Sequence, residues 1–340
     1  MRVHRHAQQG SGRRRGALQN SGQRVRRLSP LPFPSVVRLE PSAGCNLACS
    51  HCPTGTVTMK RGVMGEEVFQ RALDAIRDHI DAIRVVVLYH GGEPLLHKRF
   101  PEMIRRVKDL GVPFVKTVSN GMLLGDDEIK GLADSGLDCI EVSIDEESPV
   151  LSDFVRRNSD CQTILANVGK LVDRKRAEKP EVIICQVSFV DPGTFRQGDE
   201  PQVAAHLLEA FPDGRVGFKT AWAFRFPHME VDEEIYDQFR DPFDDEDGTT
   251  CDHVLSTITI RADGNVIPCC YDLTSQMVMG NILDDDLESI WNNRAYFELR
   301  QGIATRTYPP LCTNCNIVRP NVYLVLRPEI RKRLGGTQAS

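Results

Sequence analysis

The chain has 340 residues and a formal net charge of −5, with 41% hydrophobic and 26% charged residues. This is the composition of a globular protein, and it excludes collagen-like, low-complexity and wholly disordered classes. The sequence contains neither a run of 18 apolar residues nor a secretory signal, so we expect a cytoplasmic protein without a membrane partner.

The first segment of the chain is basic. Arginine is frequent among Gln, Gly and Ser before Val36, and the first acidic residue is Glu40. Such a composition cannot bury a core, so we interpret residues 1–33 as a flexible, solvated arm. Because the rest of the chain is acidic, we expect no broad face that binds nucleic acid.

Beyond the arm, short β-branched apolar runs alternate with amphipathic segments, which is typical of strand–helix units. The expected strands are residues 36–40, 84–89, 113–118, 138–144, 181–189 and 215–221. The expected helices are residues 66–80, 101–110, 126–135, 162–179 and 201–211. This order predicts an α/β fold with a parallel sheet and right-handed crossovers, either open or curled into a partial barrel. In both forms the loops at the carboxyl ends of the strands form the site.

The pattern changes after Arg225. The acidic residues 241–248 indicate a solvated linker, and residues 256–261 and 265–267 flank an Asp-Gly pair that favours a hairpin. Residues 287–300 are expected to form one helix, and the final thirty residues have no clear pattern. We therefore divide the chain into the arm (1–33), an α/β domain (34–240), a smaller domain (241–320) and a tail (321–340).

The eleven cysteines are clustered, which in a reducing compartment indicates metal or redox chemistry. Three of them, Cys45, Cys49 and Cys52, lie in a loop directly after the first strand. Three thiolates on a short loop can hold three irons of a [4Fe-4S] cluster and leave the fourth iron open. A zinc site would need a fourth ligand, and the only local candidate, His51, is poorly placed beside Cys52.

A second motif, Gly91-Gly92-Glu93-Pro94, follows the second strand. Its glycines allow a ligand to approach the backbone, and Glu93 can accept a hydrogen bond from an ammonium group. Together with the three-cysteine loop, this turn resembles the radical S-adenosylmethionine (SAM) superfamily. The resemblance implies that the open iron chelates the methionine part of SAM and that the Gly-Gly-Glu-Pro turn binds its amino group.

The resemblance extends along the next strands. It implies a partial (β/α)6 barrel over residues 36–225, with Ser119, Asn120, Ser143 and Asp145 contacting the carboxylate and ribose of SAM. The position before the third cysteine commonly packs near the adenine in this family, and here it is His51.

Four late cysteines, Cys251, Cys269, Cys312 and Cys315, offer four thiolates, which saturate either a zinc ion or a [4Fe-4S] cluster. With the residues between them, they resemble the SPASM/twitch auxiliary domain of radical SAM enzymes. No cysteine follows Cys315, which favours the twitch form with one auxiliary [4Fe-4S] cluster. Cys270 is an alternative ligand to Cys269, or a catalytic hydrogen-atom donor.

The resemblance implies a 5′-deoxyadenosyl radical that removes hydrogen from a substrate carbon. We expect a small carbohydrate or aminocyclitol-like substrate, with alcohol oxidation or epimerisation as the outcome, in natural-product (antibiotic) biosynthesis. The alternatives are a peptide or protein maturase, decarboxylation or carbon–carbon coupling of a sugar nucleotide, and a non-catalytic zinc-binding scaffold. The peptide alternative is disfavoured because the segment before Val36 is too short and too polar for a leader-binding domain.

We expect four residues near the strand ends to contact the substrate: Glu40, Lys219, Trp222 and Arg225. The family also suggests a flavodoxin or ferredoxin-type reductant.

Overall fold

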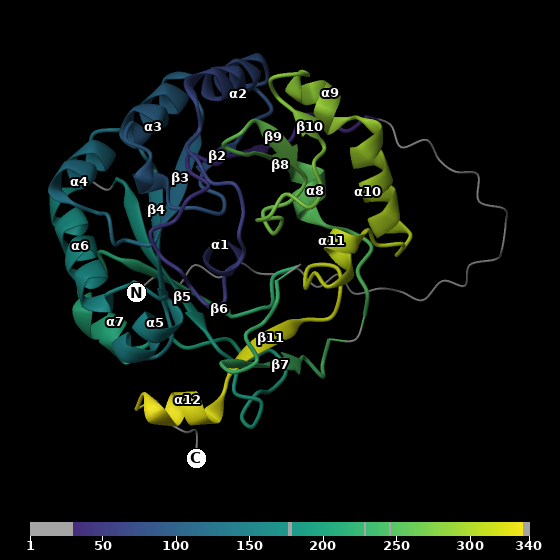
Figure 1. Cartoon of the computed structure of the whole chain (residues 1–340). Coiled ribbons are helices and arrows are strands. Elements are labelled where there is room, and N and C mark those ends of the chain that lie inside the picture. The colour runs from purple at the N-terminus through teal and green to yellow at the C-terminus, as the bar shows by residue number, and fades with distance from the viewer. Residues whose placement is uncertain (1–29, 176–178, 228, 245, 336–340) are drawn as a thin grey trace.

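The computed structural model describes residues 30–175, 179–227, 229–244 and 246–335. Its main feature is a nine-stranded sheet in the order β10-β9-β8-β1-β2-β3-β4-β5-β6 (Figure 1). Six strands run parallel in chain order, namely β1 (Val36–Leu39), β2 (Val85–Leu88), β3 (Phe114–Ser119), β4 (Cys139–Asp145), β5 (Glu181–Ser188) and β6 (Gly217–Trp222). The sheet ends at β10 and β6 and does not close, so the predicted α/β partial barrel is confirmed.

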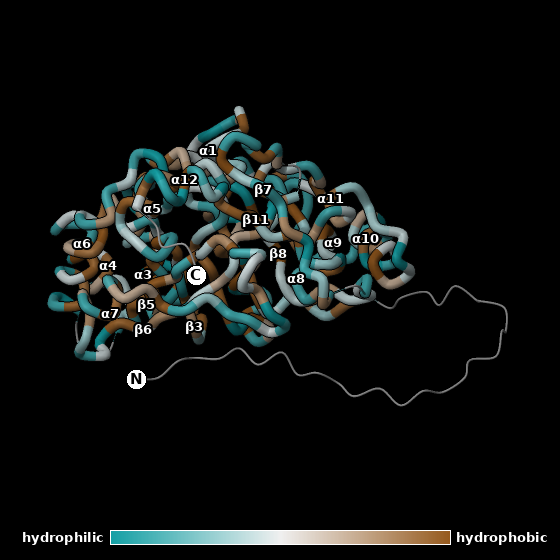
Figure 2. Tube along the Cα trace, turned by 90° about the horizontal axis from the view of Figure 1, so that it is seen from below, coloured by the Kyte–Doolittle hydropathy of each residue, from teal (hydrophilic) through white to brown (hydrophobic). Residues whose placement is uncertain are grey.

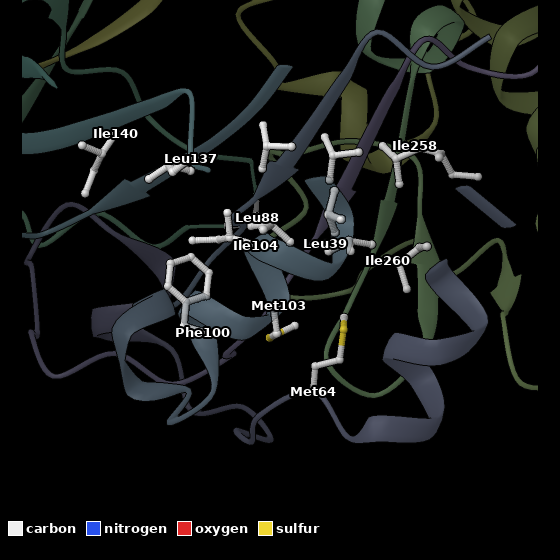
Figure 3. Close-up of a cluster of buried hydrophobic side chains, with 14 of the residues drawn as sticks. Leu39, Met64, Leu88, Phe100, Met103, Ile104, Leu137, Ile140, Ile258 and Ile260 are labelled. Atoms are coloured by element: carbon white, nitrogen blue, oxygen red, sulfur yellow. The ribbon is translucent and has the colours of Figure 1, made fainter. Parts of the chain in front are cut away.

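Five helices cover the outer face of these strands: α2 (Glu66–Asp78), α3 (Phe100–Asp109), α4 (Asp126–Ala133), α6 (Cys161–Arg174) and α7 (Ala205–Ala210) (Figure 1). Alternate strand residues such as Leu39, Leu88 and Ile140 form one core with Phe100 and Ile104 of α3 (Figure 3). Intervening strand residues therefore point to the opposite face, because side chains alternate along a strand. In Figure 2 the strands β5 and β11 are largely hydrophobic, whereas hydrophilic segments lie mainly along the outer loops.

The C-terminal part continues the same sheet. The strands β8 (Thr257–Ile260) and β9 (Asn265–Ile267) form the expected antiparallel hairpin, and β8 pairs with β1 in parallel. The strand β10 (Gly280–Asn281) pairs with β9. The short elements here and near the site are α1 (Pro53–Thr56), η1 (Pro94–Leu96), α8 (Asp252–Ser256) and α11 (Pro310–Thr313). This pairing brings the late cysteines beside the loops that follow β1 and β2.

The structure corrects the expected single helix over residues 287–300. It contains α9 (Leu287–Trp291) and α10 (Arg294–Ala304), because the Asn293 side chain accepts a hydrogen bond from the amide of Tyr296 at 3.0 Å and starts a new helix. The helix expected over residues 162–179 ends at Arg174.

Several elements have no counterpart in the sequence-based prediction, among them α5 (Pro149–Val155), β7 (Tyr236–Arg240), β11 (Val322–Leu326) and α12 (Pro328–Arg333). The helix α5 follows β4, and β7 pairs antiparallel with β11 beside the main sheet (Figure 1). The helix α12 follows β11. The predicted boundary near residue 240 thus falls at the end of a strand whose partner lies in the predicted tail. The predicted arm lies almost wholly outside the described residues.

Within the described residues, no helix is both long enough and apolar enough to cross a lipid bilayer.

Candidate functional site

The three-cysteine loop after β1 rests on the backbone of the Gly-Gly-Glu-Pro turn after β2. The amide of Glu93 donates to the carbonyl oxygen of Gly44 at 2.8 Å. A Cβ atom on Gly92 would lie 2.3 Å from the carbonyl oxygens of both Gly44 and Ser42. Only glycine allows this approach, so Gly92 forms a seat for the loop.

The far side of the loop is held by α1 and by the end of α5. A Cβ atom on Gly55 would lie 2.5 Å from the carbonyl oxygen of Cys49, so α1 packs directly on the loop. The amide of Ala48 donates to the carbonyl oxygen of Arg157 at 3.0 Å. The unpredicted helix α5 therefore helps to position the thiols.

Glu93 connects this turn to the end of β3. Its carboxylate is buried and accepts hydrogen bonds from the Ser119 hydroxyl at 2.9 Å and from the Asn120 amide at 2.8 Å. Burial raises the pKa of Glu93, and these hydrogen bonds oppose that rise. The Asn120 side chain donates to the Asn46 side-chain oxygen at 2.8 Å and lies 3.7 Å from the Cys45 sulfur. Residues predicted on three separate loops therefore form one network.

The structure gives Asp145, which was expected to contact SAM, two buried protein partners. Its side chain is fully buried, with Oδ1 at 3.1 Å from Arg156 Nη1 and Oδ2 at 3.1 Å from His51 Nε2. Burial disfavours the charged carboxylate, but Arg156 and His51 outweigh it and lower the pKa of Asp145. Ser143 lies two residues earlier on the same strand and is half-buried. Arg156 was not predicted as a site residue. The only indication in the sequence is that its charged side chain directly follows the largely apolar segment that forms α5.

His51 also contacts an aromatic cluster. Its ring lies edge-on to Phe189 with centroids 5.6 Å apart, and Phe189 stacks on Tyr236 at 5.1 Å. The Tyr236 hydroxyl lies 2.7 Å from the Ser50 hydroxyl. These contacts place His51 beside Phe189, which directly follows β5 and stacks on Tyr236 of β7.

The three early thiols suit a cluster in both chemistry and surroundings. Cys49 is buried, Cys45 and Cys52 are half-buried, and none forms a disulfide. The Cys45 sulfur accepts a hydrogen bond from the Leu47 amide at 3.4 Å. Such hydrogen bonds to sulfur are features of iron–sulfur sites, where they tune the potential. Burial raises the pKa of the Cys49 thiol to about 12, so metal binding there must displace a proton.

The late cysteines meet in a second centre. One small cavity with an otherwise largely apolar lining contains the four predicted ligands, Cys251, Cys269, Cys312 and Cys315. They come from the residue before α8, the segment after β9 and the region of α11. A soft four-thiol set fits an iron–sulfur cluster, although it would also hold zinc.

Cys270 lies outside that lining. Its sulfur is 3.6 Å from Nδ1 of His253, which is also 3.5 Å from the Cys269 sulfur. These three side chains form a compact group of potential metal ligands within the described part of the chain. His253 was not predicted as a ligand, because the prediction considered only the spacing of the cysteines. It lies two residues after Cys251.

Two of the four expected substrate contacts have other partners. Glu40 directly follows β1 and is buried against the end of β8. Its Oε2 accepts hydrogen bonds from Arg261 Nε at 3.0 Å and from the Ala262 amide at 3.1 Å. Trp222 lies against Phe195 with ring centroids 6.3 Å apart and donates its ring N–H to a backbone carbonyl at 2.9 Å. Glu40 and Trp222 were predicted as substrate contacts because they lie near strand ends. That position does not reveal the direction in which a side chain points.

The other two expected contacts are more open. Lys219 is 49% exposed, with Nζ at 3.8 Å from Glu141 Oε1. Arg225 is half-buried and donates from its guanidinium to the carbonyl oxygen of Met229 at 3.4 Å.

Comparisons with known proteins agree with this geometry. Family models match the radical SAM superfamily over residues 39–186 and the SPASM iron–sulfur cluster-binding domain over residues 251–316. A tungsten-containing aldehyde ferredoxin oxidoreductase cofactor-modifying protein of Pyrococcus furiosus is 26% identical over 321 residues, spanning 82% of this chain and 86% of the relative.

Two solved structures share the fold. BtrN in complex with AdoMet and 2-DOIA has a TM-score of 0.55 and 17% identity, over 84% of this chain and 94% of BtrN. The enzyme anSMEcpe with bound AdoMet and Cp18Cys peptide has a TM-score of 0.55 and 15% identity, over 79% of this chain and 83% of that chain.

A partial α/β barrel with a three-cysteine loop after its first strand, beside a four-thiol centre, defines an iron–sulfur enzyme. The chain belongs to the radical SAM superfamily and carries a C-terminal SPASM iron–sulfur domain. Its cofactors are a [4Fe-4S] cluster with SAM, and auxiliary iron–sulfur in the SPASM domain. Because this superfamily is enzymatic, the non-catalytic zinc scaffold is rejected.

Proposed function

We propose that this enzyme oxidises an alcohol carbon of a small, carbohydrate-like substrate. Cys45, Cys49 and Cys52 hold the cluster that binds SAM, and Cys251, Cys269, Cys312 and Cys315 hold one auxiliary cluster. When bound, these groups supply a radical that removes a hydrogen atom and an acceptor for one further electron. The substrate CH–OH group loses that hydrogen atom, the electron and the hydroxyl proton, which leaves a carbonyl group.

The observation that supports oxidation is the direct contact between the two thiol regions. The segment after Cys270 packs on the turn that follows β2: the Asp272 carbonyl oxygen lies 3.4 Å from His90 Nε2, and a Cβ atom on Gly91 would lie 3.3 Å from the Leu273 side chain. Arg261 also donates to the Leu273 carbonyl oxygen at 2.9 Å. A substrate bound near this turn would therefore lie close to both centres, as a two-electron oxidation requires.

Cys270 supports a second candidate, which is epimerisation. It is half-buried, lies outside the four-thiol cavity and contacts His253, and a thiol at this position would return a hydrogen atom to a substrate radical. The likeness to anSMEcpe with its bound peptide keeps peptide modification as a further candidate, although fold alone does not assign a substrate.

A test uses anaerobically reconstituted enzyme, dithionite and SAM, with panels of sugars, cyclitols and peptides in deuterated water. Oxidation yields 5′-deoxyadenosine together with a product that has lost two hydrogens. Epimerisation yields a product that has gained one solvent deuterium, and Cys270→Ala should abolish it. Formation of 5′-deoxyadenosine with turnover of peptides alone would refute the proposal.

A further inference from the structure

The face of the parallel sheet opposite the helices carries a group of charged side chains, which we call the lumen cations: Arg38, Lys116 and Lys219. The core residues Val37 and Val115 occupy neighbouring positions and pack on the helix side. Because side chains alternate along a strand, the lumen cations point to the other face. The SAM-binding turns lie at the carboxyl ends of the same strands, so this face is where a substrate would meet the radical.

Strand register places the lumen cations near one another. Arg38 pairs with Val87, and Val87 pairs with Lys116, so Arg38 and Lys116 lie in one row two strands apart. Two strand spacings amount to roughly 10 Å, which two long side chains can bridge through a shared ligand. Lys219 pairs with Cys185 of β5.

One carboxylate serves two of the lumen cations. Glu141 Oε1 is 2.9 Å from Lys116 Nζ and 3.8 Å from Lys219 Nζ. Burial alone would raise the pKa of Glu141, but the two lysines outweigh it and lower that pKa, so the carboxylate is charged at neutral pH. Lys116 and Lys219 are 25% and 49% exposed, so their ammonium groups remain accessible.

Arg38 has a cationic group with unused donors. Its Nη1 reaches the Tyr89 carbonyl oxygen at only 3.4 Å, and its buried Nε has no hydrogen-bond partner in the described chain. No ion pair involves Arg38 within the described residues. Burying an unsatisfied donor costs about 1–3 kcal/mol, more if it is charged, so such a group indicates a missing acceptor.

We propose that the lumen cations bind an anionic group of the substrate, a carboxylate or a phosphate, and that Glu141 limits the affinity of this site. This inference rests on the proposed function and narrows its substrate class to an acidic or phosphorylated carbohydrate. Apart from the Glu40–Arg261 pair, two carboxylates share this face with the three cations: Glu141, and Glu181, which lies in one row with Lys116. The face therefore keeps an excess of one positive charge. A substrate whose only charge is an ammonium group, as in an aminocyclitol, is repelled by this face.

Binding of defined probes to the reconstituted, SAM-bound enzyme tests the inference. The probes are glucose 6-phosphate, glucuronate and inorganic phosphate, with glucose and glucosamine as the neutral and cationic comparisons, followed by calorimetry at low salt. We expect the anionic sugars to bind and the other two sugars not to bind. Glucuronate and glucose 6-phosphate then distinguish carboxylate from phosphate recognition, and inorganic phosphate shows whether the sugar is needed.

Substitutions give effects of opposite sign. Lys116→Met and Lys219→Met should each weaken binding of the preferred anion about tenfold or more, because a charge-assisted hydrogen bond is lost. Glu141→Gln should strengthen it several-fold. Lys130→Met, on the exposed face of α4, is the matched control and should leave binding unchanged.

The inference is overturned if no anionic probe binds at millimolar concentration, if glucosamine binds as well as the anions, or if Lys116→Met behaves like Lys130→Met. Formation of 5′-deoxyadenosine with the panels of sugars, cyclitols and peptides, measured on the same preparation of the parent enzyme, reports on the proposed function. Its absence would refute radical chemistry, whereas its presence without anion binding would refute only this inference.

Discussion

The buried pair of Arg156 and Asp145 should be one of the main stabilising contacts around the cysteine loop. The Asp145 carboxylate is fully buried, and Arg156 has a side-chain exposure of 9%. Arg156→Met removes the cation while keeping an unbranched apolar side chain of comparable length. It leaves the carboxylate with His51 as its remaining side-chain partner.

Removing one partner of a buried ion pair costs about 3–5 kcal/mol, because the other charge stays buried without compensation. A protein with a total stability of about 5–15 kcal/mol should then lose roughly 10 °C in Tm. The folded-state pKa of Asp145 lies below its ordinary value of 3.8, so this stabilisation is present above pH 3.8 and is lost as pH falls through the lowered pKa. The difference between parent and Arg156→Met should therefore shrink in acid.

Thermal unfolding of the anaerobically reconstituted protein measures this effect. Arg157→Met is the matched control, because Arg157 is 50% exposed and lies 3.6 Å from Asp232, and a surface pair contributes about 1 kcal/mol or less. Adding Asp145→Asn to Arg156→Met should recover part of the loss, since no buried charge then remains. The reasoning is refuted if Arg156→Met unfolds within about 1 kcal/mol of Arg157→Met.

Three further predictions concern other parts of the molecule. Gly92→Ala should displace the three-cysteine loop and remove the iron of the first cluster, because its Cβ would overlap two backbone carbonyl oxygens. Cys251→Ser should remove the auxiliary iron, whereas Cys270→Ser should retain it, and metal analysis with electron paramagnetic resonance distinguishes the two. Burial raises the pKa of Glu146 to about 7, against the opposing charge of Arg331, so native stability should fall as pH rises from 4.5 through about 7. Glu146→Gln should remove this fall and raise the free energy of unfolding by up to about 3 kcal/mol at pH 8, measured by urea unfolding.

Each of these outcomes has a control or a contrary result. Gly62→Ala, where nothing lies within 4 Å of the added Cβ, should keep all its iron, and equal loss in both glycine variants would contradict the seat assigned to Gly92. Loss of auxiliary iron in Cys270→Ser but not in Cys251→Ser would reverse the ligand assignment. A Glu146→Gln variant with the same pH dependence as the parent would show that another group titrates.

Much of the fold was predictable because its signals are local. The β-branched runs and the amphipathic segments each lie within one element, and all six parallel strands were predicted to within two residues at either end. The prediction failed where a capping residue interrupts an amphipathic pattern. Asn293 starts a new helix inside a segment whose hydrophobic pattern is continuous. The helix α5 was missed because it is short.

The candidate site was predicted in its motifs but not in its partners. Three thiols within eight residues and a Gly-Gly-Glu-Pro turn identify their chemistry wherever they fold. The protein partners of Asp145 and Glu40 were not predicted, because Arg156 and Arg261 approach them from other elements. A residue near a strand end can point toward the substrate or toward a neighbouring element, and only the register of the sheet distinguishes these directions.

The sequence by itself thus determined the superfamily, the first cluster loop and the order of strands and helices, since each is encoded by residues close together in the chain. Tertiary structure alone decided which side chains meet: Glu40 with Arg261 across 221 positions, the four late thiols around one cavity, and the cations on the inner face of the sheet. The physical reason is that these contacts bury surfaces from segments that are distant in sequence. Examples are the pairing of β1 with β8 and the packing of α5 on the cysteine loop, and no local sequence pattern specifies either of them.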